Sequence, residues 1–132
     1  MILPEAINSD VLKKLFEDAY METSVDTDGD VIVKDNYRCY LRPDQDGRLI
    51  SVYAIFGCQP NASQADKLAY INRVNDQVKM VRASVSSNGK FFFDYYISVE
   101  GGVSRRSIVM SVRRFFSCLG SALREDSGNV VA

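Results

Sequence analysis

Hydrophobic periodicity divides the first half of the chain into one helical segment and three strand segments. Residues 9–21 predict an amphipathic helix, because apolar side chains recur at helical spacing among charged ones: Val11, Leu12, Leu15, Phe16 and Ala19. Residues 31–33, 37–42 and 49–56 are short and rich in β-branched and aromatic residues. Turn sequences separate these three segments, which predicts three antiparallel strands in a meander.

The second half of the chain repeats this change of period. Ser63 predicts the N-cap of a second helix that ends at about residue 78. Residues 81–86 and 91–99 predict two more strands, joined at Asn88-Gly89, a strong hairpin signal. Ser104 then predicts the N-cap of a last helix, whose apolar side is formed by Ile108, Val109, Val112, Phe115, Phe116 and Leu119. The predicted order is α-β-β-β-α-β-β-α.

Tight turns between consecutive strands favour an α+β fold, in which an antiparallel sheet packs helices on one face. Residues 1–122 are expected to form a single domain. Residues 123–132 show little apolar periodicity, so we expect a flexible C-terminal tail that does not dock.

Composition excludes some classes of function but does not identify a single one. The chain of 132 residues is 46% hydrophobic and 25% charged, which is typical of a globular protein. Its formal net charge of −1 gives no overall attraction to nucleic acid or to anionic lipid. Histidine is absent, which removes the commonest acid-base catalyst, and no residues have metal-ligand spacing. We therefore expect no cofactor and no metal.

Cysteine content and hydropathy indicate a cytoplasmic protein. Cys39, Cys58 and Cys118 are odd in number and far apart, which disfavours disulfides and zinc sites and predicts reduced, mostly buried thiols. The first residues lack the pattern of a secretory leader, and no stretch has the length of a membrane span. Neither secretion nor membrane insertion is expected.

Two local motifs, together with the element order, resemble a known family. They are Asn72 and Asn75 within the second predicted helix, and the strand-to-helix junction Glu100-Gly101-Gly102-Val103-Ser104. In its element order and these two motifs the chain resembles the YbjN family, whose members are described as sensory transduction regulators. The resemblance implies a fold similar to that of type III secretion chaperones, dimeric proteins that hold secreted effectors in extended form. It implies no catalytic residues.

The residues of both motifs suit structural roles. The two glycines allow the backbone to turn sharply, and Ser104 can accept from orphan amides of the last helix. The asparagines, three apart on a helix, could bond to backbone where helix and strand meet, although ligand binding remains an alternative.

Alternation along residues 91–99 predicts a second aromatic surface of the sheet. Phe91, Phe93, Tyr95, Ile97 and Val99 would face the helices, which leaves the opposite face to Phe92, Asp94, Tyr96 and Ser98. Tyr40 and Tyr53 could join that opposite face from neighbouring strands. Three helices can hardly cover both faces, so Tyr40, Tyr53, Phe92 and Tyr96 are candidates for a homodimer or partner interface. Alternatively, one helix wraps around, or the tyrosines are isolated at the surface.

Three other features suggest different functions. Arg105, Arg106, Arg113 and Arg114 form a basic cluster that could bind nucleic acid, or could simply be a solvated helix face. Residues 26–30 resemble a calcium loop, but lack the required first and last ligands and favour an acidic turn. Cys58 is expected to be partly exposed, and could serve a small enzyme or ligand binder.

The sequence thus favours a cytoplasmic, non-enzymatic YbjN-like protein that forms a homodimer. It would bind a protein or peptide through its sheet face or an exposed edge, as a regulator or a chaperone-like module. The alternatives are a nucleic-acid-binding regulator that uses the last helix, and a small-ligand binder or enzyme.

Overall fold

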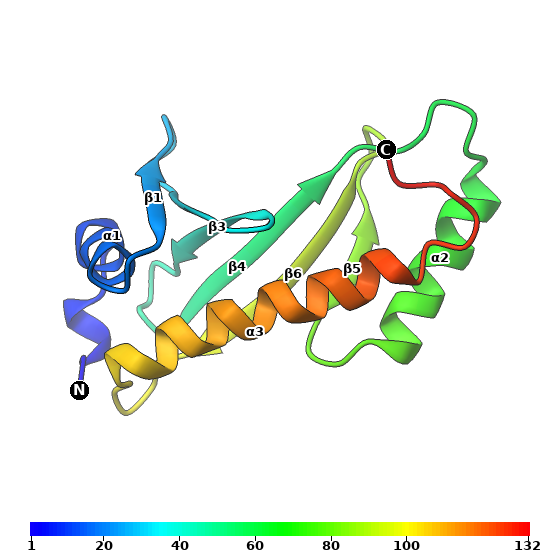
Figure 1. The fold of residues 1–132 in the computed structure, drawn as a ribbon. Helices are drawn as coiled ribbons and strands as arrows, with labels where there is room; N and C mark the ends of the chain where they lie inside the picture. The colour runs from blue at the N-terminus through cyan, green and yellow to red at the C-terminus, as the bar shows by residue number, and fades with distance from the viewer.

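One six-stranded antiparallel sheet and three α-helices make up the computed structural model, which describes residues 1–132 (Figure 1). The strands lie in the order β1-β2-β3-β4-β6-β5. Their bounds are β1 Glu22–Val25, β2 Val31–Lys34, β3 Arg38–Pro43, β4 Leu49–Phe56, β5 Arg82–Val85 and β6 Phe91–Ser98. The helices are α1 Ser9–Asp18, α2 Gln64–Gln77 and α3 Arg105–Arg124, preceded by the short 3-10 helix Pro4–Ala6.

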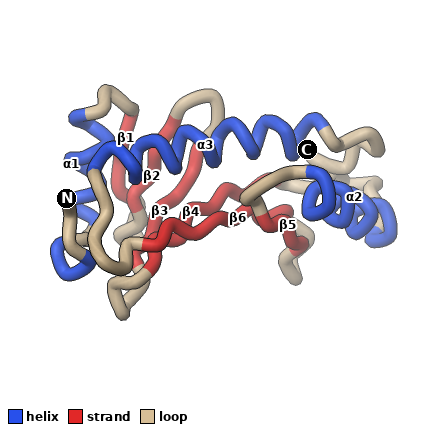
Figure 2. Tube along the Cα trace, turned by 90° about the horizontal axis from the view of Figure 1, so that it is seen from below, coloured by secondary structure: helices blue, strands red, loops and turns tan.

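The helices pack against one face of the sheet, as the sequence predicted. Figure 2 shows α1 and α3 on the same side of the strands, with α2 at the far end beside β5. The opposite face of the sheet carries no helix (Figure 2). The molecule therefore has two layers, and one sheet face lacks a helical cover.

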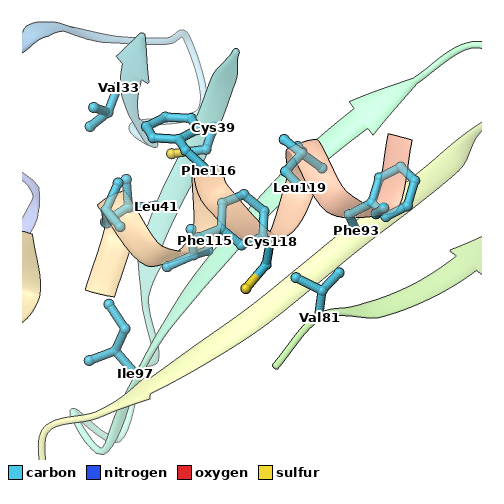
Figure 3. Close-up of a cluster of buried hydrophobic side chains, with 14 of the residues drawn as sticks. Val33, Cys39, Leu41, Val81, Phe93, Ile97, Phe115, Phe116, Cys118 and Leu119 are labelled. Atoms are coloured by element: carbon cyan, nitrogen blue, oxygen red, sulfur yellow. The ribbon is translucent and has the colours of Figure 1, made fainter. Parts of the chain in front are cut away.

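The hydrophobic core fills the space between the sheet and these helices. Alternate residues of each central strand point into it, because successive side chains of a strand face opposite sides. In β6 these are Phe91, Phe93 and Ile97, all buried, as predicted. In Figure 3, α3 contributes Phe115, Phe116, Cys118 and Leu119 to the same cluster, opposite Val33, Cys39 and Leu41 of the strands. Burial raises the pKa of the Cys39 thiol to about 12, so this thiol is inert.

The first helix is shorter than predicted and is followed by a strand that the sequence did not predict. Tyr20 adopts a left-handed conformation, and the amide of Met21 donates to the carbonyl of Phe16, so α1 closes in a Schellman motif. Prediction of a helix through Met21 is therefore wrong. The residues of β1, Glu22–Val25, are polar and mostly exposed, so they lack the alternation by which a strand is predicted.

Predicted caps and turns agree with the structure. Ser63 accepts from the amide of Asp66, and Ser104 accepts from the amide of Ser107, so both helix starts are confirmed. The β5–β6 hairpin turns at Gly89, whose φ of +81° suits glycine.

The C-terminal residues dock, contrary to prediction. Val130 is 2% exposed within the core, and the carboxylate of Asp126 accepts from the amides of Val130 and Val131 at 2.9 and 3.0 Å. Main-chain bonds connect this segment to the loop after β4, through Gln59 to Val130 and Ala132 to Gly57. One apolar side chain and main-chain pairing hold the segment, and neither produces a periodic pattern.

The two outer edges of the sheet differ. The side-chain amide of Asn75 donates to the carbonyl of Ala83 at 3.1 Å and accepts from its amide at 2.8 Å, so α2 closes the edge of β5. This confirms the structural role expected for Asn75. The other edge is β1, which pairs only with β2. The amide of Asp26 donates to the carbonyl of Asp30 across the β1–β2 hairpin. Hydrogen-bonded and non-hydrogen-bonded positions alternate along an antiparallel strand, so the main-chain groups of Thr23 and Val25 point away from β2, toward the free edge.

A buried carboxylate ties three strands together on the face without helices. Asp30 is 3% exposed and accepts two hydrogen bonds from Arg42, at 2.7 and 2.8 Å, and one from the Tyr53 hydroxyl at 2.7 Å. Burial alone would raise the pKa of Asp30, but the hydrogen bonds from Arg42 and Tyr53 outweigh it and lower this pKa. The ionised form of Asp30 is therefore favoured by folding.

Asp30→Asn is expected to lower the free energy of unfolding by about 2 kcal/mol at neutral pH, because it removes charge-assisted hydrogen bonds. The folded-state pKa of Asp30 lies below its unfolded value, so its contribution is complete above the unfolded pKa and is lost as pH falls through the folded one. Urea denaturation at stepwise lower pH should show the wild type and variant converging in acid. Asp28→Asn, in the same turn, serves as the control, and a gap that stays constant with pH would contradict this role.

Asn75→Ala is expected to lower the free energy of unfolding by about 1–2 kcal/mol, because both bonds to the main chain of Ala83 are lost. Hydrogen exchange of the Ala83 amide should accelerate, since this amide then faces water. Asn72→Ala is the matched control, because Asn72 is exposed and makes no side-chain hydrogen bond. Equal decreases in the free energy of unfolding in the two variants would show that the contact between Asn75 and Ala83 does not stabilise the fold.

Candidate interaction surface on the open sheet face

The sheet surface that faces away from α1 and α3, here called the open face, carries the aromatic residues predicted as an interface. Strand pairing places Tyr40 opposite Tyr53, and Tyr53 opposite Asp94. The rings of Tyr40 and Tyr53 stack at 5.1 Å between centroids. Phe92 and Tyr96 flank Asp94 on the same face, by alternation along β6. Geometry thus brings together all four aromatic residues that the sequence singled out.

The centre of the open face is hollowed. A depression of about 430 Å³ is lined by Arg42, Ser51, Tyr53, Ile55, Phe92, Asp94 and Tyr96, which come from β3, β4 and β6. Ile55 and Tyr96 are 38% and 45% exposed, although both are large apolar or aromatic side chains. The depression therefore offers an apolar floor to a partner.

Ion pairs within the chain lie on both sides of this floor. On one side Arg42 binds the buried Asp30. On the other, Arg82 of β5 binds Asp94 of β6 through two hydrogen bonds, at 2.9 and 2.6 Å, and its guanidinium lies 5.7 Å from the Tyr96 ring centroid. Hydrogen bonding to Asp94 raises the pKa of Arg82 further, so this guanidinium stays charged. Arg42 and Arg82 are thus both paired with carboxylates of the same chain.

Sequence reasoning missed the charged residues of the open face. Asp30 directly precedes β2, and Arg42 lies two residues after Tyr40, so alternation could have placed Arg42 on the face of Tyr40. The Arg82–Asp94 pair lies across the β5–β6 hairpin, so the register set by the predicted Asn88-Gly89 turn could have placed these two residues opposite each other.

The four arginines of the predicted basic cluster point to different surroundings. Arg105 forms an ion pair with Asp18 of α1 at 3.2 Å. Arg113 lines a depression with residues of the α1–β1 connection and the β2–β3 turn, whereas Arg114 lines another beside the turn after α2. Arg106 is exposed. No single hollow contains all four arginines.

Residues 26–30 form a turn between β1 and β2, as the sequence favoured. One oxygen of the Asp26 carboxylate accepts from the amides of Asp28 and Asp30, at 3.0 and 2.9 Å. Gly29 has a φ of +85°, which this turn requires. The Asp26 carboxylate thus binds the backbone of its own loop.

Cys58 is partly buried, and its thiol donates to the carbonyl of Gly89. A carbonyl is neither a base nor a cation, so this contact supplies no group that would activate the thiol as a nucleophile. The three cysteines are free, and no group of three or more histidine, cysteine, aspartate or glutamate side chains is placed to hold a metal.

Comparison with solved structures finds several proteins that share this fold. YbjN from E. coli, described as "a putative transcription regulator", aligns with a TM-score of 0.81 at 14% identity, over 100% of this chain and 99% of that chain. An uncharacterized protein from Methanothermobacter thermautotrophicus aligns with a TM-score of 0.65 at 11% identity, over 92% and 98% of the two chains.

A type III secretion chaperone also shares this fold. The crystal structure of the Yersinia pestis chaperone SycH in complex with a stable fragment of YscM2 aligns with a TM-score of 0.52 at 13% identity, over 92% and 98% of the two chains. At these identities the likeness shows the fold alone, and it confirms the predicted chaperone-like architecture. None of the curated proteins matches this chain.

The family comparison covers most of the chain. The model of the YbjN family, described as "Putative bacterial sensory transduction regulator", matches residues 8–122. This range runs from the residue before α1 to two residues before the end of α3, so it includes the whole sheet, α1, α2 and most of α3. The chain belongs to the YbjN family, as its sequence motifs indicated.

Proposed function

We propose that this protein is a non-enzymatic regulator that works by binding protein, and that it forms a homodimer through its open face. One observation carries the proposal: an aromatic, hollowed sheet surface that no helix covers. A sheet face with large exposed aromatic side chains is stabilised when a second surface removes it from water.

The charges of the open face support association. Burial of an unpaired charge opposes binding, because the desolvation cost is not recovered. Arg42 and Arg82 each have a carboxylate partner in the same chain, so a facing surface need not supply one. Tyrosine is enriched in interfaces, since its ring contributes apolar area and its hydroxyl can still find a partner. Tyr40, Tyr53, Phe92 and Tyr96 would supply most of the contact area.

Relatives of the fold support a protein partner. The chaperone SycH was solved with a fragment of another protein, and one further structure with this fold is the HopA1–SchA chaperone–effector complex. By analogy, this chain would hold or regulate another protein. Its β1 edge offers outward main-chain groups to an extended segment, while the open face is used by the dimer.

The enzyme alternative receives no positive support from the described geometry. The Cys58 thiol binds a carbonyl, and the Asp26 carboxylate binds the backbone of its own turn. Free thiols also suit a reducing compartment, so we place the protein in the cytoplasm.

Light scattering coupled to size exclusion tests the dimer on the intact chain and on Tyr96→Asp. The wild type should have twice the mass of one chain. The substitution buries a charge at the centre of the interface, so it should weaken dimerisation by about 2 kcal/mol or more, roughly thirtyfold. Circular dichroism should show that the variant remains folded.

Met110→Asp is the matched control, because Met110 is 48% exposed on the outer side of α3, away from the open face. This variant should keep the mass of the wild type. A wild type that stays monomeric over the whole concentration range would refute the dimer. Equal weakening by the two substitutions would move the interface away from the open face.

A further inference from the structure

A second hollow lies between the turn that follows α2 and the outer side of α3, at the end of the molecule where Figure 1 shows these elements together. Its volume is about 560 Å³, larger than the depression on the open face. We call it the α2–α3 cleft. Its lining consists of Gln77, Val78, Lys79, Met80, Arg114, Ser117, Cys118 and Ser121.

The cleft carries positive charge without compensation. Lys79 and Arg114 line it, and neither side chain forms an ion pair or a hydrogen bond within the chain. No carboxylate residue belongs to the lining. This differs from Arg42 and Arg82 of the open face, each of which is bound by an aspartate of the same chain. Two unpaired cations that line one hollow favour the approach of an anion.

Hydroxyl groups of α3 extend this polar wall. Ser117 and Ser121 are one turn apart and line the cleft together with Arg114, which lies one turn before Ser117. The Ser121 hydroxyl already donates to the Ser117 carbonyl and accepts from Arg124. The Ser117 hydroxyl has no partner in the chain, so it is free to donate to a ligand oxygen.

The direction of α2 works against an anion, but its effect is smaller. A helix C-terminus carries about half a negative charge, and α2 ends at Gln77 beside the cleft. Lys79 and Arg114 together supply two full positive charges at the same place. The balance of charge in the cleft is therefore positive.

The remaining lining is apolar. Val78 and Met80 come from the turn after α2, and Met80 is 56% exposed although its side chain is large and apolar. Met80 has a φ of +65°, a conformation that a non-glycine residue rarely adopts. These two side chains can contact the carbon skeleton of a ligand whose charged group faces Arg114.

We propose that the α2–α3 cleft binds a small molecule that carries a phosphate group. Arg114 would hold two phosphate oxygens through its planar fork, Lys79 would act as a point charge, and Ser117 would donate one hydrogen bond. Val78 and Met80 would contact the organic part of the ligand. A small molecule suits the volume of the cleft, which lies in the usual range of ligand pockets. Nucleic acid suits it less, because Arg105 and Arg113 lie in other surroundings.

Inorganic pyrophosphate is the probe for this site. Titration into the ¹⁵N-labelled protein, against sodium chloride of equal ionic strength, should give saturable NMR shifts confined to residues 77–80 and 114–121. Arg114→Gln and Lys79→Gln should each weaken pyrophosphate binding about tenfold, since each removes one charge-assisted contact. Both side chains are exposed and unpaired, so both variants should fold.

Arg106→Gln is the matched control, because it removes the same charge from an exposed position of α3 outside the cleft. Its affinity for pyrophosphate should equal that of the wild type. Shifts that do not saturate, or equal weakening by the Arg106 and Arg114 variants, would overturn the proposal. Tighter binding of a short single-stranded RNA, lost equally in both variants, would also overturn it in favour of nucleic acid.

Discussion

The packing of α3 across one face of the sheet is the constraint on which the rest of the structure depends. A helix of 20 residues extends about 30 Å, long enough to cross several strands, and its buried side supplies Phe115, Phe116 and Leu119 to the core. The sheet has a second face of equal size, and three helices placed on one side leave that face without cover. The exposure of the aromatic residues on the open face follows from this placement of all three helices on one side of the sheet.

On the open face, which no helix covers, Asp30 and Asp94 are paired with arginines, and the rings of Tyr40 and Tyr53 stack. Asp30 is withdrawn from water, yet Arg42 and Tyr53 satisfy its oxygens. The same contacts order the Arg42 and Tyr53 side chains before any partner arrives. Side chains that are already fixed lose less entropy on binding, so a surface of this kind can associate with a modest contact area. The α2–α3 cleft is the opposite case, because its cations remain unpaired.

Alternation and turn chemistry allow much of the fold to be predicted from sequence. Tyr40, Tyr53, Phe92 and Tyr96 could be assigned to one face because each lies on a strand with buried neighbours. Strand β1 could not be predicted, because an edge strand with polar residues buries neither face fully. Docking of Val130 depends on the Asp126 carboxylate and on main-chain pairing with residues 57–59, which local patterns do not encode. The charged pairs of the open face lie across the β2–β3 and β5–β6 hairpins, so the register of these hairpins could have placed them.

The unequal edges of the sheet constrain how the proposed dimer could hold a partner. Asn75 occupies the hydrogen-bonding groups of Ala83, so strand addition at β5 would first have to displace α2. At β1 the groups of Thr23 and Val25 face outward, and the strand is short and polar, which limits uncontrolled pairing between edges. A dimer formed through the open face does not need to bury either edge of the sheet. On the proposed function, each subunit would therefore keep one edge available for an extended segment, with α2 restricting such pairing to the β1 side.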